Sequence, residues 1–180
     1  AEPMKLGLDL RGGIHVLIDV DMDAAVAQTV DRYNDDVWQV LREEKIRYVT
    51  VRSSGLAIDA VFRDAGTRDA AAELIGNEFR NLDVDTSENG DEFLVTASLG
   101  AKELEATRKF ALQQNITTLR NRVNQLGVAE PGIQQQGDRR IVVQLPGVQD
   151  PGRVKEILGA TATLEYRLVD TEHSVQDAID

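Results

Sequence analysis

The chain of 180 residues contains no cysteine, two histidines and few aromatic residues, which make up 4% of the sequence. The absence of cysteine excludes disulfide bonds, thiolate zinc sites and cysteine nucleophiles. The shortage of aromatic residues, together with the lack of a basic–aromatic strand motif, argues against the base-stacking surface of RNA-recognition domains. No apolar run approaches the ~20 residues that a membrane-spanning helix needs. We therefore expect no membrane helix within this chain.

The composition is acidic, with 31 aspartates and glutamates against 20 lysines and arginines and a formal net charge of −11. Such a surface repels a phosphate backbone, so we expect no nucleic-acid partner. Attraction to anionic lipid would need a local basic patch, and the candidates are Arg139–Arg140 and the group Arg108, Lys109, Arg120 and Arg122. We interpret both as ordinary solvated faces. The 42% content of hydrophobic residues is enough for one ordinary domain or two small ones.

The sequence contains no recognisable catalytic or metal-binding constellation. It has no Walker loop, no Gly-x-Ser-x-Gly and no Gly-x-Gly-x-x-Gly. The run Asp19–Asp23 resembles the start of an EF-hand loop, but Ala24 replaces the turn glycine and Val30 replaces the bidentate glutamate. His15 falls in an expected strand and His173 in the C-terminal tail. We therefore predict no enzymatic activity, no cofactor and no metal site.

Hydrophobic periodicity predicts a regular succession of strands and helices. Ile14, Val16, Ile18 and Val20 alternate with other residues, which predicts a strand over 14–21. The further expected elements are a helix capped by Asp23, strands at about 47–53 and 56–63, a helix from Asp64 to about Phe79, strands at about 82–87 and 92–99, a helix at about 101–126, strands at about 133–137 and 139–145, a helix from Asp150–Pro151 to Gly159 and a strand at about 163–169.

Three sequence blocks are more informative than these patterns. They read Gly-Leu-Asp-Leu-Arg-Gly-Gly at 7–13, Leu-Arg-Asn-Arg-Val-Asn-Gln-Leu-Gly-Val-Ala-Glu-Pro at 119–131 and Ile-Leu-Gly-Ala-Thr-Ala-Thr-Leu-Glu-Tyr-Arg at 157–167. Together and in this order, they resemble the first extracytoplasmic domain of the SecD family of protein-export membrane proteins. The family-motif residues are Gly7, Asp9, Arg11, Gly12, Gly13, Asn121, Arg122, Asn124, Gly127, Glu130 and Pro131.

The order of elements contains β-α-β-β-α-β twice, which predicts an α+β fold with two ferredoxin-like modules. In a tandem arrangement, 14–87 and 92–169 form separate modules. In a nested arrangement, the strand 14–21 lies between the strands 139–145 and 163–169, and the inserted module closes on its own last strand. Nesting is favoured because some SecD relatives pass almost directly from the first strand to the helix of the second block. We expect 1–22 plus 100–170 to form a base, 23–99 an inserted module and 171–180 the start of a linker.

The resemblance also implies a function and a location. SecD proteins act with SecF beside the SecYEG channel and use the proton-motive force to complete export of precursor proteins. The resemblance places this chain in the periplasm, as part of an inner-membrane protein, where it would form a rigid base and touch the emerging preprotein. The charged residues that conduct protons in the family lie in membrane helices, which this chain lacks.

The family-motif residues have a structural and a docking interpretation. Structurally, Gly12–Gly13 lets the backbone turn into the strand, and we expect a positive φ at Gly13. The block at 121–131 would be a helix end, a glycine cap and an extended residue before proline. In the docking interpretation, the glycine block is a hinge that transmits force from a preceding membrane helix. The structural interpretation is favoured for both blocks.

A different class of function stays open, namely a small-ligand regulatory module with a ferredoxin-like fold. Such a module would need a polar pocket at a subunit interface. For the export function, we expect weak binding of unfolded polypeptide, by addition of a strand to an exposed sheet edge such as 47–53.

Overall fold

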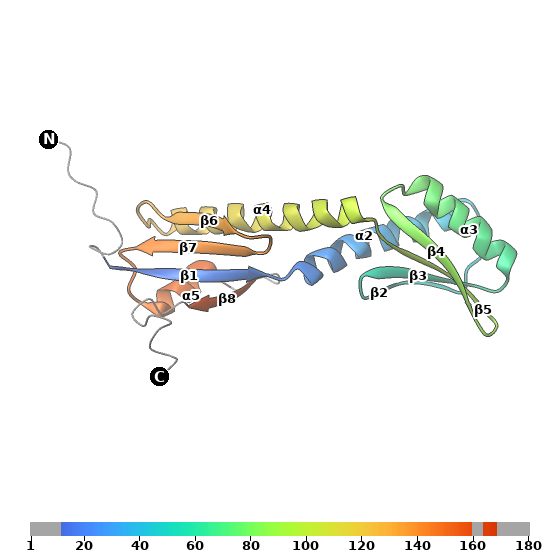
Figure 1. The fold of residues 1–180 in the computed structure, drawn as a ribbon, viewed down its shortest axis with the longest axis horizontal. Helices are drawn as coiled ribbons and strands as arrows, with labels where there is room; N and C mark the ends of the chain where they lie inside the picture. Colours follow the sequence, from blue (N-terminus) through green and yellow to red (C-terminus); the bar gives the residue numbers. More distant parts are fainter. Residues whose placement is uncertain (1–11, 160–163, 169–180) are drawn as a thin grey trace. The chain divides into compact units, whose positions relative to one another are not determined.

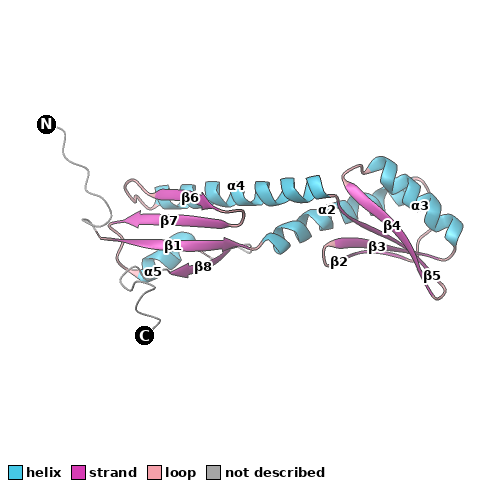
Figure 2. Ribbon diagram, in the orientation of Figure 1, coloured by secondary structure: helices cyan, strands magenta, loops and turns pink. Residues whose placement is uncertain are grey.

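The computed structural model describes residues 12–159 and 164–168 (Figure 1). Its elements in chain order are β1 (Gly13–Val20), α2 (Met22–Glu43), β2 (Thr50–Ser54), β3 (Ala57–Phe62), α3 (Ala65–Glu78), β4 (Leu82–Asn89), β5 (Glu92–Leu99), α4 (Ala101–Gln125), β6 (Gly132–Gln136), β7 (Arg140–Pro146), α5 (Pro151–Leu158) and β8 (Leu164–Leu168). The elements follow the predicted order, and only their ends differ by a few residues (Figure 2). The cap expected at Asp23 is wrong, because α2 begins at Met22 and places Asp23 in its first turn.

The first sheet has the strand order β6-β7-β1-β8 and is antiparallel throughout. Within it, Ile18 of β1 pairs with Ile141 of β7 on one side and with Tyr166 of β8 on the other. The prediction that the strand after the glycine block lies between these two partners is confirmed. The tandem alternative is wrong, because among the described strands β1 pairs only with β7 and β8.

The second sheet has the strand order β2-β3-β5-β4 and is also antiparallel. This is the ferredoxin-like order when β5, the last strand of the segment, is counted as the first strand of the module. The module therefore closes on its own last strand, as the nested arrangement requires. Both sheets confirm an α+β fold with two ferredoxin-like modules, one nested in the other.

The chain divides into two compact units, one formed by residues within 1–22 and 109–180 and the other by residues 23–108. We call them the split unit and the inserted unit. The split unit takes in only the part of α4 after Arg108, whereas the earlier turns of α4 belong to the inserted unit. The assignment of the two units as base and addition stays a prediction.

Each unit has its own hydrophobic core. In the split unit, Ile18 and Ile141 from the sheet and Leu119 from α4 are all 0% exposed. In the inserted unit, Val37 and Leu41 from α2 and Ile75 from α3 are likewise 0% exposed. Burying one such side chain contributes about 1.5–3 kcal/mol, so each helix is held mainly by the apolar face that it turns to its sheet.

Two predicted helix caps are confirmed. The carboxylate of Asp64 accepts hydrogen bonds from the backbone N–H of Thr67 at 2.7 Å and from its hydroxyl at 2.8 Å, at the start of α3. The carboxylate of Asp150 accepts from the backbone N–H of Gly152 at 2.9 Å, at the start of α5. Over the described part of the chain, no helix has both the length and the apolar composition needed to cross a membrane.

Candidate functional site

Of the glycine block, the structure describes only Gly12 and Gly13. Gly7, Asp9 and Arg11 lie outside the described residues. Gly12 has a φ of +65°, and a Cβ atom there would lie 2.9 Å from the side-chain nitrogen of Gln149. Its carbonyl accepts a hydrogen bond from the N–H of Gly147 at 3.0 Å. Gly13 is already part of β1 and pairs with Pro146. The positive φ predicted for Gly13 is therefore wrong and belongs to Gly12, because the turn must be complete before the strand begins.

Arg122 of the second block holds the end of α5. Its guanidinium nitrogen Nη1 donates a hydrogen bond to the carbonyl of Leu158, the last residue of α5. A cation at this end also interacts favourably with the helix dipole. The neighbouring Gly159 has a φ of +50°, and a Cβ atom there would lie 2.8 Å from the same Arg122 nitrogen. The second and third sequence blocks therefore meet, and their charged and glycine residues serve one helix end.

The rest of the second block forms the end of α4 and the turn to β6. Gly127 has a φ of +68° and donates its N–H to the carbonyl of Asn124 at 3.1 Å, which confirms the predicted glycine cap. Glu130 has a φ of +52°, so the extended residue expected before Pro131 is wrong. The short connection from Gly127 to β6 has to reverse the chain direction, and the left-handed residue provides part of that reversal. Asn121 and Asn124 are exposed, and Pro131 is half-buried.

The other candidates from the sequence lie apart from these blocks. The Arg140 side chain donates to the carboxylate of Asp19 at 2.9 Å, and Arg139 lies 3.9 Å from the same oxygen. These contacts join β1 to the start of β7 and to the β6–β7 turn. His15 lies on β1 opposite Gln144, and His173 lies outside the described residues. Within residues 12–159 and 164–168, no three or more His, Cys, Asp or Glu side chains are placed to hold a metal ion.

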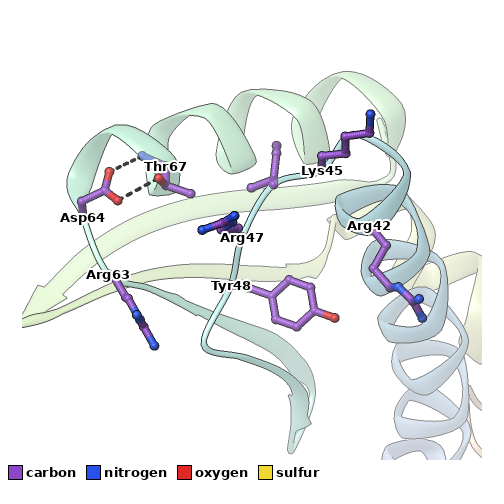
Figure 3. A pocket seen from close by; sticks show the side chains of 8 residues that line it. Arg42, Lys45, Arg47, Tyr48, Arg63, Asp64 and Thr67 are labelled. Carbon is purple, nitrogen blue, oxygen red and sulfur yellow. Dashed lines mark hydrogen bonds between the residues drawn. The ribbon is translucent and has the colours of Figure 1, made fainter.

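The inserted unit has an open cavity of about 850 Å³ between the end of α2 and the start of α3 (Figure 3). Its charged lining consists of Arg42, Lys45, Arg47, Arg63 and one acid, Asp64. A smaller hollow of about 320 Å³ shares Arg42 and includes Trp38. We define the basic–aromatic surface as Trp38, Arg42, Lys45, Arg47, Tyr48 and Arg63.

The cations of the basic–aromatic surface are not neutralised within the described part of the chain. No described carboxylate forms an ion pair with Lys45, Arg47 or Arg63. The Arg42 guanidinium lies 4.4 Å from the centre of the Trp38 ring, a cation–π contact. Asp64 is occupied as the α3 cap, and the hydrogen bonds from the Thr67 backbone N–H and then from its hydroxyl lower the pKa of Asp64.

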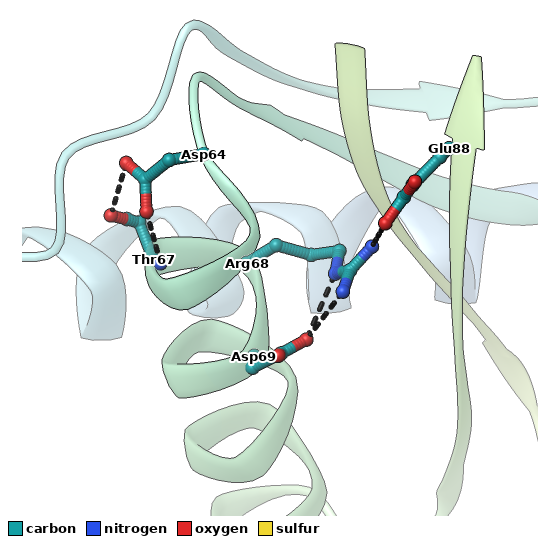
Figure 4. Close-up of polar contacts among 5 residues, drawn as sticks. All are labelled: Asp64, Thr67, Arg68, Asp69 and Glu88. Carbon is teal, nitrogen blue, oxygen red and sulfur yellow. Dashed lines mark hydrogen bonds and ion pairs between the residues drawn. The ribbon is translucent and has the colours of Figure 1, made fainter. Parts of the chain in front are cut away.

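Arg68 on α3 differs from the cavity cations because it is paired with carboxylates (Figure 4). Its guanidinium contacts Asp69 at 2.9 Å and Glu88 at 2.9 Å. The hydrogen bonds that Arg68 donates, to Glu88 first and then to Asp69, raise the pKa of Arg68. Arg68 is thus held by carboxylates of its own unit, whereas Lys45, Arg47 and Arg63 form no ion pair with a described residue.

The sequence patterns do not indicate this surface for two reasons. Glu43 and Glu44 separate Arg42 from Lys45 in the sequence, and the residues at the start of α3 come close to these cations only in the folded chain. A weak signal is present: five of the ten lysines and arginines in residues 1–90 fall between 42 and 63. The basic groups that the sequence does indicate lie in 108–140, and two of their arginines, Arg122 and Arg140, are engaged with their own unit.

Comparison with known proteins connects these features to a family. Residues 2–24 match the family model described as the SecD/SecF GG motif, and residues 112–171 match the N-terminal part of the P1 domain of protein translocase subunit SecDF. Protein translocase subunit SecD of Escherichia coli K12 is 53% identical over 172 residues, which is 95% of this chain. The chain belongs to the SecD family. SecD of Pseudomonas aeruginosa is 44% identical over 99% of the chain, and SecD of Haemophilus influenzae is 43% identical over 99%.

The matches distribute unevenly over the structure. Apart from residues 23 and 24, both matched ranges fall in the split unit and include β1, β6, β7, α5 and β8. The chain spans less than a third of the length of these relatives, 28% of the Escherichia coli protein and 29% of the Pseudomonas aeruginosa protein.

Proposed function

We propose that this chain is the first periplasmic region of a SecD translocase subunit, which supports proton-motive-force-dependent late steps of preprotein export. In this proposal the region acts with SecF and the SecYEG channel and touches the emerging preprotein. It catalyses no reaction itself, and the residues that use the proton gradient lie in the membrane part of the subunit. The observation that carries the proposal is the 53% identity to a SecD translocase subunit over 95% of the chain.

The position of the glycine block supports a mechanical role for the split unit. The block leads directly into β1, which pairs with β7 along one edge and with β8 along the other. A force applied at the start of a central strand is shared by the backbone hydrogen bonds on both sides. In addition, buried side chains of α4 pack against those of β1 in the core of the split unit. A force applied at Gly12 would therefore be transmitted to the whole unit. This arrangement supports the proposal that the split unit is the base and that the glycine block is its point of attachment.

In this proposal the inserted unit makes the contact with the preprotein. β2 lies at one edge of its sheet, and among the described strands only β3 pairs with it. An unfolded chain can add a strand to such an edge through backbone hydrogen bonds alone, independently of its own sequence. This mode suits a factor that handles many different clients.

A chimera tests the proposal. The corresponding segment of Escherichia coli SecD would be replaced by residues 1–180 in cells depleted of their own SecD. We expect the chimera to restore export of a secreted precursor, and late translocation into inverted membrane vesicles to stop when a proton ionophore is added. The matched control is the same chimera carrying Leu119→Ala in the core of the split unit. A chimera that accumulates in the membrane yet leaves export at the depleted level would show the proposal to be wrong.

The small-ligand regulatory module stays a separate prediction. Calorimetry of the 180-residue chain against panels of amino acids and nucleotides tests it directly. Saturable binding of one metabolite would favour this alternative, whereas we expect no heat of binding from any of them.

A further inference from the structure

The charge of the basic–aromatic surface is an exception in an acidic protein. The chain has a formal net charge of −11, yet four cations line one cavity with a single acid, which is already used as a helix cap. Exposed cations without partners repel one another and gain little from the fold. The net charge of the chain would therefore repel a ligand that carries several carboxylates, whereas the cations of this cavity would attract it.

Lys45 is placed on this surface at a conformational cost. Its φ is +59°, and its N–H bonds the carbonyl of Arg42 at 3.1 Å, while the N–H of Ile46 bonds the carbonyl of Leu41 at 2.9 Å. These two bonds define a Schellman motif that ends α2, with Lys45 at the left-handed position that glycine usually occupies. At this position a residue with a Cβ atom is less favourable than glycine. The fold thus carries a lysine where glycine would be more stable, and this lysine faces the cavity region.

The aromatic residues make the surface suitable for a polypeptide. Trp38 is the only tryptophan of the chain and is 41% exposed, with Arg42 stacked on its ring. Tyr48 lines the cavity and is half-buried. Tryptophan, tyrosine and arginine are the residue types that contribute most energy to protein–protein interfaces. An exposed tryptophan in this setting therefore favours a protein ligand.

The open edge of β2 begins at the cavity. Tyr48 precedes β2 by two residues, and Arg63 directly follows β3, the neighbour of β2. The hairpin between them has the two-residue loop Gly55–Leu56, so its closing pair Ser54 and Ala57 is hydrogen-bonded. Because such pairs alternate, the backbone N–H and C=O groups of Val51 and Ser53 point to the open edge. The cations thus lie at one end of a strand whose outer backbone groups pair with no other described strand.

We propose that the basic–aromatic surface binds acidic segments of an extended polypeptide, whose backbone then pairs with the open edge of β2. This inference rests on the proposed function, in which the chain meets an emerging preprotein. Arg47, Arg63 and Lys45 bind the carboxylates, Trp38 and Tyr48 contact the apolar parts of side chains, and Val51 and Ser53 bond the backbone. Backbone pairing makes the contact general, and the cations favour clients with acidic segments.

A polypeptide fits better than the other anions of similar charge. An anionic membrane or a nucleic acid would be attracted by the cations, but neither has amide groups for the free edge of β2. The chain as a whole has a formal net charge of −11, which would repel a large polyanion. The open edge of β2 therefore favours a polypeptide as the ligand.

Titration of Trp38 fluorescence in the 180-residue chain tests the proposal. The probes are blocked twelve-residue peptides: one alternating glutamate and threonine, one with lysine in place of each glutamate, and one acidic peptide with alternate backbone nitrogens methylated. We expect the acidic peptide to bind at least about tenfold more tightly than the lysine peptide at low salt, and the difference to shrink in 0.5 M salt. Methylation should weaken binding about fivefold, because it removes the strand hydrogen bonds. In an isotope-labelled sample, the amide signals of Val51 and Ser53 should shift.

Three variants locate the effect on the protein. The double variant Arg47→Glu/Arg63→Glu changes two exposed side chains and should lose about tenfold in affinity. The matched control Arg120→Glu, an exposed arginine of the split unit, should bind within about twofold of the unchanged chain. Lys45→Gly should weaken acidic-peptide binding about threefold, while its midpoint of urea unfolding rises rather than falls. This last variant separates binding from stability.

Several results would contradict the proposal. Equal affinity for the acidic and lysine peptides, or the same loss in Arg120→Glu as in the double variant, would overturn the proposal. Tighter binding of phosphatidylglycerol vesicles or of an oligonucleotide, dependent on Arg47 and Arg63, would assign the surface to a lipid or a nucleic acid instead. Export by the chimera without acidic-peptide binding would refute this inference alone. Peptide binding with an inactive chimera would refute only the export proposal.

Discussion

The split unit and the inserted unit have the same ferredoxin-like strand order but use their cations differently. In the split unit, Arg122 holds the last carbonyl of α5, and Arg140 pairs with Asp19 across two strands. In the inserted unit, Lys45, Arg47 and Arg63 line a cavity and have no ion pair with the described residues. This contrast is the basis for two proposals: that Arg122 of the family blocks helps to maintain the fold of the split unit, and that these three cations of the inserted unit bind a partner.

The two units also differ in how their strands are connected. The split unit must bring β1 together with β7, which follows it by more than 100 residues, as in the pair Asp19 and Arg140. The inserted unit is formed by one continuous segment, 23–108. Because long-range pairing is slower to form, we expect the inserted unit to fold first and to shorten the effective loop for the split unit.

The largest effect should come from removing the core of one unit at a time. Leu119→Ala in the split unit and Ile75→Ala in the inserted unit each delete a side chain that is 0% exposed, and each should cost about 2–5 kcal/mol. Urea unfolding would be followed by circular dichroism and by the fluorescence of Trp38, which lies in the inserted unit. Ile75→Ala should shift the Trp38 transition, and Leu119→Ala should leave it nearly unchanged. Identical shifts of both probes in both variants would show that the units unfold as one.

The next effect concerns the turn into β1. Gly12→Val should destabilise the chain by about 1–3 kcal/mol, because a β-branched residue disfavours the observed φ of +65°. The Gln149 amide that would contact the new side chain is flexible and adds little. Gly13→Val, in the extended strand, should cost less, and thermal unfolding of both variants measures the difference. A larger loss at Gly13 would contradict the position of the turn.

The contrast between engaged and available cations can be measured directly. Arg122→Met should cost about 1–3 kcal/mol, because it leaves the Leu158 carbonyl without its charged donor. Arg47 is exposed and has no ion pair with a described residue, so Arg47→Met should change the free energy of unfolding by less than about 0.5 kcal/mol. Both values come from urea unfolding under the same conditions. Equal losses in the two variants would remove the distinction between the units.

The smallest expected effect is on the pKa of the Asp64 carboxyl group. The hydrogen bonds from Thr67 lower the pKa of Asp64 below its ordinary value of 3.8. Since the folded pKa is the lower one, the stability that this cap contributes is present above the ordinary pKa and is lost as the pH falls through the folded pKa. An NMR titration of the Asp64 carboxyl carbon should show the lowered pKa, and Thr67→Ala should raise it in part, because the backbone donor remains. No change in Thr67→Ala would show that the hydroxyl has no role.

Local features of the fold agree with the sequence because they depend on residues close together in the chain. The caps at Asp64 and Asp150 and the left-handed Gly127 each follow from residue type and from contacts within a few positions. The errors are local as well. Gly13 and Gly12 are neighbours of the same type, so the sequence alone could not decide which of them makes the turn. Glu130 adopts a left-handed φ that its residue type does not favour, because the turn to β6 requires it.

The sequence by itself determined the order of helices and strands, the caps at Asp64, Asp150 and Gly127, and the membership of the SecD family, since these follow from periodicity, local hydrogen bonding and motif residues. Periodicity left the tandem and nested arrangements open, and only the tertiary structure decided that β1 lies between β7 and β8. It also decided that Arg122 meets the end of α5 and that cations from the α2–β2 and β3–α3 connections line one cavity. The physical reason is the same in each case: these contacts join residues far apart in the chain, and they are specified by the packing of a whole core rather than by any single segment.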